Sequence, residues 1–452
     1  MAGGAVLLMI SANFLRRTGG SARLGNMMKQ GHMSALAVVA LGIGSMVGAG
    51  IFSLMGQVAL VAGKAVWVSF LLGGVVAMFS GLSFGRLGAR FPTAGGMLDF
   101  FNRAFRPGVL AGGLCLVYLL TLLLTVALVA RSFGFYAVGL LHSLGLPAPD
   151  TGWFTAGVIV LLGVLNMQVA SLVGRVEVLL VLLKVGVLLL LIGAGAPDLQ
   201  GNVPQAAAAQ LSMDALFGSV GLTFFAYAGY GMMANAAPNL QNPARQLPRL
   251  IPAAIALVAL LYMALALVIT REVAPLQLAQ DADTAIAAAA APLMGEYGYV
   301  AVAVAALVAT ASAINATLFC MLRLEDGLAE HSELGRLFRP QRELGNGASW
   351  GYVFLLVLCV VLGVGVQLAE TARIAGVTFL FSYLAVYAAH WKLRHETGAR
   401  NWEILAGAAL MLLLCAGVCV SLWQRDVWLL VAVALVLGVA FAGEWLARRR
   451  KS

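Results

Sequence analysis

The sequence predicts an all-α polytopic membrane protein, and three observations lead to this fold class. The 452 residues are 62% hydrophobic and only 10% charged, whereas soluble domains are about 45–50% apolar and about 25% charged. The apolar residues form long runs rather than the short alternating segments of a membrane β-barrel. The five Cys follow no spacing typical of a disulfide framework. A soluble globule, a strand barrel and a disulfide scaffold are therefore excluded.

The charge-free runs locate the transmembrane helices, because a helix needs about 20 residues to cross the hydrocarbon layer. Eleven runs contain no Asp, Glu, Lys or Arg: 33–63, 65–85, 107–130, 151–174, 215–244, 250–270, 297–322, 344–369, 374–391, 404–424 and 427–443. Residues 178–197 add another apolar run, which only Lys184 interrupts. The sequence therefore predicts twelve transmembrane helices, preceded by a tail over 1–32.

The distribution of Lys and Arg predicts the orientation of these helices. If the N-terminus is cytoplasmic, 22 of the 28 basic residues fall in cytoplasmic segments. The outer loops then hold only four: Lys64, Arg271, Arg373 and Arg425. By the positive-inside rule both termini are cytoplasmic. The net charge of +9 is then explained by topology and by contacts with lipid headgroups, so no nucleic acid is expected as a partner.

Two of the predicted helices are interrupted by glycine near the middle of the bilayer. Four glycines lie close together in the first helix: Gly42, Gly44, Gly48 and Gly50. Their centre is about ten residues, or about 15 Å, from Ser34. The sixth helix carries Gly229 and Gly231 at a comparable depth. One interpretation is close helix packing. Interrupted helices at corresponding positions of two halves instead favour a transporter built as an inverted repeat.

Five stretches, in order along the chain, resemble one transporter family. They read GSMVGAGIF at 44–52, FPTAGG at 91–96, VGRVEVLLVLLK at 173–184, FAYAGY at 225–230 followed by NPARQLP at 242–248, and SAIN at 312–315. Together they resemble the amino acid–polyamine–organocation permease superfamily. The resemblance implies a LeuT-like fold, a five-plus-five inverted repeat with two added helices. The repeats would occupy 33–200 and 201–395, and helices 11 and 12 with a basic tail would occupy 396–452.

The physics of an opened first helix suggests how such a site binds an amino acid. An opening at 48–51 exposes backbone amides at the positive end of the outer half-helix, which favour a carboxylate. The carbonyls that the inner half and the sixth helix leave free would accept from an ammonium group. The candidate substrate-binding residues are Ser45, Met46, Gly48, Ala49, Gly50, Ile51, Phe225, Ala226, Ala228, Gly229 and Gly231. The resemblance places Phe225 as an aromatic gate above the substrate.

The sequence favours a neutral substrate side chain. Permeases of this kind that carry cationic amino acids often have an acidic residue just after the sixth-helix break, where this chain has Gly231. The acidic residue usually found ahead of the Asn-Pro pair is replaced by Asn239. A charged substrate tail without a partner would cost several kcal/mol of desolvation. A neutral and apolar side chain is expected, with a cationic amino acid or polyamine as the alternative.

Lys184 is the ionisable residue expected to couple transport to protons. It lies ten residues beyond Gly174, about 15 Å along the helix and too deep to snorkel to an interface. Its expected partners are carbonyls of the first helix and the hydroxyl of Ser312. A purely structural role, in which a permanent charge holds the first helix, is the alternative. In the resembled family, sodium-independent members have a Lys at this position.

The sequence and the resemblance thus predict a sodium-independent secondary transporter of neutral, apolar L-amino acids in a bacterial inner membrane. It is expected to work by proton coupling or by exchange, through alternating access. Its expected partners are the amino acid, protons and membrane lipids, in a monomer or a homodimer. A channel or scaffold-like member without a transport cycle remains the alternative. No cofactor or metal is expected, because the sequence has no phosphate loop and no paired His ligands. A membrane enzyme would need clustered His or carboxylates, so that class is disfavoured.

Overall fold

The computed structural model describes residues 33–93, 95–106, 108–168, 173–196, 212–272, 281–331 and 349–449. The tail predicted over 1–32 and the end of the basic C-terminal tail lie outside these residues. Nearly all of the described chain is helical, and its only β-pairing is an isolated bridge between Met33 and Leu240. The all-α prediction is therefore confirmed.

Nine helices of the described chain are long and apolar enough to cross a membrane. One of them, Ala35–Arg90, contains two of the predicted spans, which are joined at a short turn. Thr151–Met167 and Trp350–Gly365 are shorter apolar helices at two further predicted positions. These helices establish a polytopic membrane protein, and the count of twelve crossings stays a prediction.

The helical elements follow the predicted spans closely in the chain. In the first half they are α3 Ala35–Met46, η1 Val47–Ile51, α4 Phe52–Ala62, η2 Gly63–Ala65, α5 Val66–Arg90, α6 Met97–Ala104, α7 Val109–Ser143, α8 Thr151–Gln168 and α9 Val173–Gly195. In the second half they are α11 Met213–Tyr227, η4 Ala228–Tyr230, α12 Gly231–Asn235, η5 Ala237–Asn239, α13 Pro243–Glu272, η6 Ala282–Thr284, α15 Ala285–His331, α16 Trp350–Gly365, α17 Leu368–Lys392, α18 Arg394–Thr397, α19 Asn401–Arg425 and α20 Val427–Arg449. Gly295 divides α15 with a positive φ of 71°, just before the predicted eighth span.

The interruption of the first span differs in form from the opened backbone that was expected. Between α3 and α4 the chain makes the π-helical turn η1. The residues that flank this turn keep helical dihedrals, with φ −61° and ψ −54° at Met46 and φ −67° and ψ −31° at Phe52. This structure therefore has a π-helical turn in place of an opened backbone, and the opening at 48–51 stays a prediction.

The glycines of the first span let other backbones approach it closely. A Cβ on Gly48 would lie 2.5 Å from the Ala309 carbonyl oxygen on α15, and one on Gly50 would lie 2.2 Å from the Ala226 carbonyl oxygen on α11. Both distances are far below ordinary contact, so only glycine fits here. Close helix packing, the alternative interpretation of the glycine pattern, is thus what these two residues provide.

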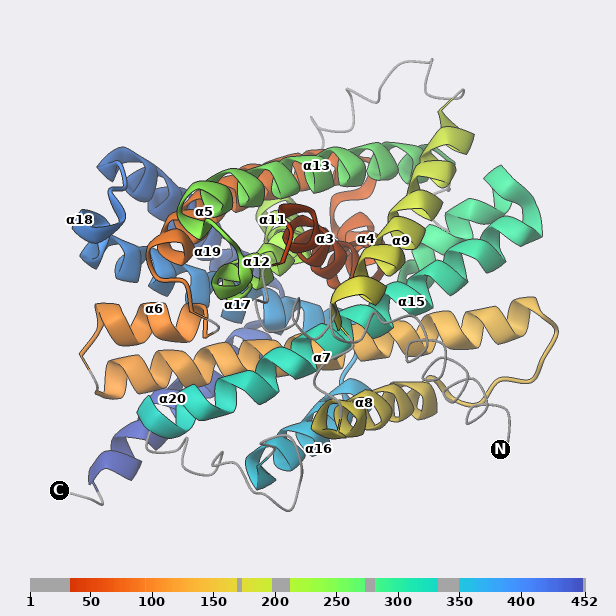
Figure 1. Ribbon diagram of the computed structural model, residues 1–452. Coiled ribbons are helices and arrows are strands. Elements are labelled where there is room, and N and C mark those ends of the chain that lie inside the picture. The colour runs from red at the N-terminus through yellow and green to blue at the C-terminus, as the bar shows by residue number, and fades with distance from the viewer. Residues whose placement is uncertain are drawn as a thin grey trace, which may run out of the picture.

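The sixth span is interrupted at the position that its glycines predicted. The helix α11 ends at Tyr227, the 3₁₀ turn η4 follows, and α12 and η5 continue to Asn239. Leu240 is then extended, with φ −86° and ψ 143°. Figure 1 shows α3, α4, α11 and α12 in the middle of the molecule, with α5 and α13 on one side and α7, α8 and α16 on the other. The two interruptions therefore meet at the centre of the bundle.

Candidate functional site

A cavity lies between the two interruptions and has a volume of about 40 Å³. Six of the residues predicted from the sequence line it: Ser45, Ala49, Phe225, Ala228, Gly229 and Gly231. Glycine is needed at 229, because a Cβ there would lie 2.5 Å from the Met46 amide nitrogen. At Gly231 the nearest atoms would be 3.4 and 3.7 Å away, so this position has room for a substrate group.

The other five predicted residues do not line the cavity. Met46 and Ile51 are fully buried in packing contacts, and Gly48 and Gly50 face neighbouring backbones as described above. Ala226 supplies the carbonyl that Gly50 approaches. Gly48, Gly50 and Ile51 are therefore part of the π-helical turn and pack against neighbouring elements, whereas Ser45 and Ala49 line the cavity.

Residues of five helices complete the walls, and the sequence did not indicate them. They are Met97 on α6, Tyr118, Leu122 and Thr125 on α7, Met232 on α12, Thr317 on α15, and Phe379 and Tyr383 on α17. Tyr118, Leu122 and Thr125 follow helical spacing along α7. A polar residue recurring on one face of an apolar span is the signal that could have indicated this wall.

The tyrosine on α17 binds the interrupted sixth helix directly. Its hydroxyl group donates to the Ala228 carbonyl oxygen at 3.1 Å. That carbonyl was expected to be free for a substrate, and in this structure Tyr383 occupies it. Phe225 and Phe379 meet edge to face with their ring centres 5.1 Å apart. The aromatic gate expected at Phe225 therefore has a partner on α17.

The chemistry of the cavity is that of an uncharged site. None of the side chains that the structure describes along its walls is Asp, Glu, Lys or Arg. The polar groups are hydroxyls, from Ser45, Tyr118, Thr125, Thr317 and Tyr383. A cavity of this volume accommodates about three water molecules, which is less than an amino acid occupies. The helices around the cavity would therefore have to separate to admit an amino acid.

Lys184 lies beside the cavity, in contact with the first span. The side chain is completely buried. Its Nζ donates to the Gly44 carbonyl oxygen at 2.9 Å and to the Ser312 hydroxyl at 3.4 Å. These contacts confirm both partners predicted from the sequence and join α9 to α3 and α15. Gly44 directly precedes Ser45, so the ammonium group binds the backbone one residue away from the cavity wall.

Comparisons with known proteins agree with this arrangement. The family described as amino acid permease matches residues 33–442. The chain belongs to this family. It is 43% identical over 407 residues to the inner membrane transport protein YbaT of Escherichia coli, a match that covers 89% of this chain and 94% of the relative. The predicted resemblance to the permease superfamily is confirmed, and the chain is an amino acid permease whose helices are apolar enough to cross a membrane.

Relatives of lower identity differ in the substrates that their names state. The branched-chain amino acid permease BcaP of Lactococcus lactis is 25% identical over 399 residues, covering 80% of this chain and 81% of the relative. The chloroplastic cationic amino acid transporter 9 of Arabidopsis thaliana is 26% identical over 329 residues, a match that covers 67% of this chain and 55% of the relative. Since these relatives include both kinds, the substrate class must be argued from the cavity.

Proposed function

We propose that this permease is a sodium-independent secondary carrier of neutral, apolar L-amino acids that works by alternating access. In this proposal the twelve helices form two inverted repeats, 33–200 and 201–395, followed by two added helices. The observation that carries the substrate class is the uncharged cavity at the meeting point of the two interrupted spans. A cationic side chain bound there would lack a carboxylate partner and would be strongly disfavoured.

The backbone at the two interruptions is the part suited to the amino acid head group. When the π-helical turn opens, the amides of Ala49, Gly50 and Ile51 would face a carboxylate at the start of α4. The carbonyl groups near Ser45 and Ala228 would accept from the ammonium group. Tyr383 donates to the Ala228 carbonyl in this structure, so a substrate would exchange places with this hydroxyl rather than occupy an unsatisfied acceptor.

The apolar walls of the cavity suit the substrate side chain. Leu122, Met232 and Phe379 provide hydrocarbon surface, and the missing side chain at Gly231 leaves space beside them. A branched aliphatic or an aromatic side chain therefore fits best. The name of the Lactococcus relative, a branched-chain amino acid permease, supports this substrate class.

Lys184 is proposed to couple substrate movement to protons or to exchange. The protonated amine donates to the first span and to α15. A neutral amine would hold both acceptors less strongly, because hydrogen bonds from charged donors are about twice as strong as neutral ones. The protonation state of one buried group would thus bias two conformations of the first span.

The proposal is tested with purified protein in liposomes. Counterflow of the twenty amino acids should show exchange of leucine, isoleucine, valine or phenylalanine and none of arginine or lysine. Thermal unfolding of the detergent-solubilised protein should show stabilisation by the same amino acids, of about 2.7 kcal/mol at a concentration 100 times Kd. Exchange confined to cationic amino acids would refute the substrate class. Absence of both exchange and stabilisation would instead favour a channel or scaffold.

A further inference from the structure

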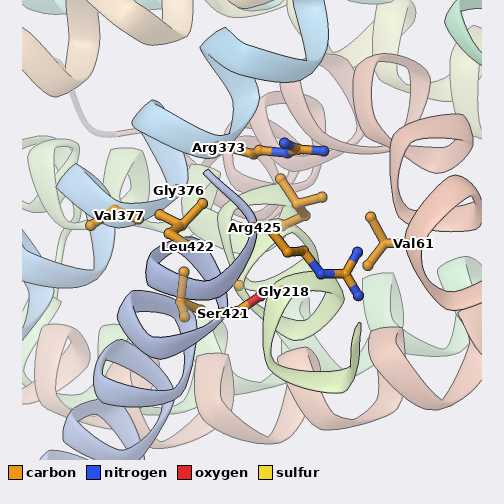
Figure 2. A pocket seen from close by; sticks show the side chains of 11 residues that line it. Val61, Gly218, Arg373, Gly376, Val377, Ser421, Leu422 and Arg425 are labelled. Atoms are coloured by element: carbon orange, nitrogen blue, oxygen red, sulfur yellow. The ribbon is translucent and has the colours of Figure 1, made fainter. Parts of the chain in front are cut away.

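A second pocket lies at the end of the bundle that the sequence places on the outer face. Its residues come from the end of α4, the first turns of α11 and α17, and the end of α19. Six of them are glycine, serine or arginine: Gly218, Gly221, Arg373, Gly376, Ser421 and Arg425. The pocket has a volume of about 40 Å³. Figure 2 shows the side chains of Arg373 and Arg425 extending toward the same side, on which Val61 lies.

The charges at this pocket are unusual for the face on which it is expected. Only four basic residues are predicted in the outer loops, and two of these four line the pocket. Arg425 forms a salt bridge with Asp214 at the start of α11, which neutralises it. Arg373 has no ion pair among the residues that the structure describes. The pocket therefore carries one uncompensated guanidinium group, which favours an anion.

The pocket and the substrate cavity are lined by neighbouring residues of the same two helices. On α11, Leu222 lines the pocket and Phe225 lines the cavity. On α17 the corresponding residues are Gly376 and Phe379. Each pair is three residues apart, which is about 4.5 Å of helical rise on one face. The edge-to-face rings of Phe225 and Phe379 therefore lie about one helical turn from the pocket residues Leu222 and Gly376.

The glycines keep the pocket open near the arginine. A Cβ on Gly376 would meet nothing closer than the Gly221 carbonyl oxygen at 3.7 Å, and one on Gly218 nothing closer than the Ser421 hydroxyl at 3.5 Å. These glycines are unlike Gly48 and Gly50, whose neighbours leave no space for a side chain. The walls are otherwise aliphatic, from Val61, Leu222 and Val377. An apolar surface beside a lone guanidinium group suits a carboxylate that bears an apolar substituent.

We propose that this pocket is an outer recognition site for the transported amino acid, in which Arg373 binds the substrate carboxylate before the ring pair opens. The inference rests on the proposed transport function. A guanidinium group binds a carboxylate through two parallel hydrogen bonds. The site raises the concentration of substrate above the rings of Phe225 and Phe379, and it takes no part in binding within the central cavity.

The test compares uptake by intact cells, in which only the outer face is exposed, with binding by the purified protein. Arg373→Gln should raise the KM for uptake about tenfold and leave the maximal rate unchanged. The Kd obtained from thermal stabilisation should not change, because the central cavity is intact. Arg373→Lys keeps the charge without the paired donors and should give an intermediate KM. Arg271→Gln, at a basic residue predicted on the same face but outside the pocket, should behave like the wild type.

The dependence of KM on salt is a second readout, which a purely structural role of Arg373 would not change. Raised ionic strength screens the guanidinium group, so KM should rise with salt in the wild type and much less in Arg373→Gln. A wild-type KM and salt dependence in Arg373→Gln would overturn the inference while the wild type still transports. If Arg373→Gln does not fold, a KM for Arg373→Lys equal to that of the wild type overturns it. If the wild type neither transports nor binds any amino acid, the proposed function itself fails and this inference fails with it.

Discussion

Gly50→Ala tests the packing of the two interrupted spans with the smallest possible change. The added Cβ would lie 2.2 Å from the Ala226 carbonyl oxygen and 2.9 Å from the Ala226 Cα. Ordinary contact between heavy atoms needs about 3.5 Å, so the two helices would have to part by roughly 1 Å. Overpacking of this kind costs about 1–3 kcal/mol, which reduces an equilibrium constant by about 5- to 150-fold.

Thermal unfolding and counterflow of the purified variant measure this cost. We expect the Tm to fall by a few degrees and substrate exchange to decrease strongly, because Ala49 and the cavity wall move with Gly50. The matched control is Gly186→Ala on α9, where an added Cβ meets no atom within 4 Å. That variant should match the wild type or be stabilised by up to about 1 kcal/mol. A Tm and a Kd for Gly50→Ala equal to those of Gly186→Ala would refute the close approach.

Three further substitutions test the charge arrangement of the site. Lys184→Ala should abolish the dependence of uptake on an imposed pH gradient. Ser312→Ala should change this dependence less, because the Gly44 carbonyl still accepts from Lys184. An unaltered dependence in Lys184→Ala would leave the lysine a structural role only. Gly231→Glu should weaken binding of neutral amino acids, measured as Kd by thermal stabilisation, because it places a carboxylate in a cavity whose described walls carry no charge. An unchanged Kd would mean that residue 231 does not border the bound substrate.

The sequence predicted those features of the site that leave a local signal. An isolated lysine deep in an apolar span has to find acceptors in the bundle, so the contacts of Lys184 with the first span and Ser312 could be anticipated. Glycines within two spans indicated where the helices are irregular. The same glycines could not show which kind of irregularity forms, because an opened backbone and a close helix contact both require the absence of a side chain.

The remaining walls of the cavity depend on packing between helices that are distant in the sequence. Thr125, Thr317 and Phe379 lie in spans without any local irregularity, and similar residues elsewhere in those spans face other helices. Which face of α7, α15 or α17 meets the cavity is decided by how these helices cross their neighbours. The hydrogen bond from Tyr383 to the Ala228 carbonyl likewise joins residues 155 positions apart, and neither residue alone indicates it.

The contact between Lys184 and Gly44 suggests how a proton and a substrate would affect each other. The Gly44 carbonyl also accepts from the Val47 amide at the start of the π-helical turn, so the ammonium group holds the backbone where this turn begins. A substrate that requires the turn to open would then compete with the proton. Coupling of this kind is reciprocal, so saturating substrate should release protons from the purified protein and substrate affinity should rise with pH. A pH indicator in weakly buffered solution measures the release. Release of the same size from Lys184→Ala would show that another group carries the proton.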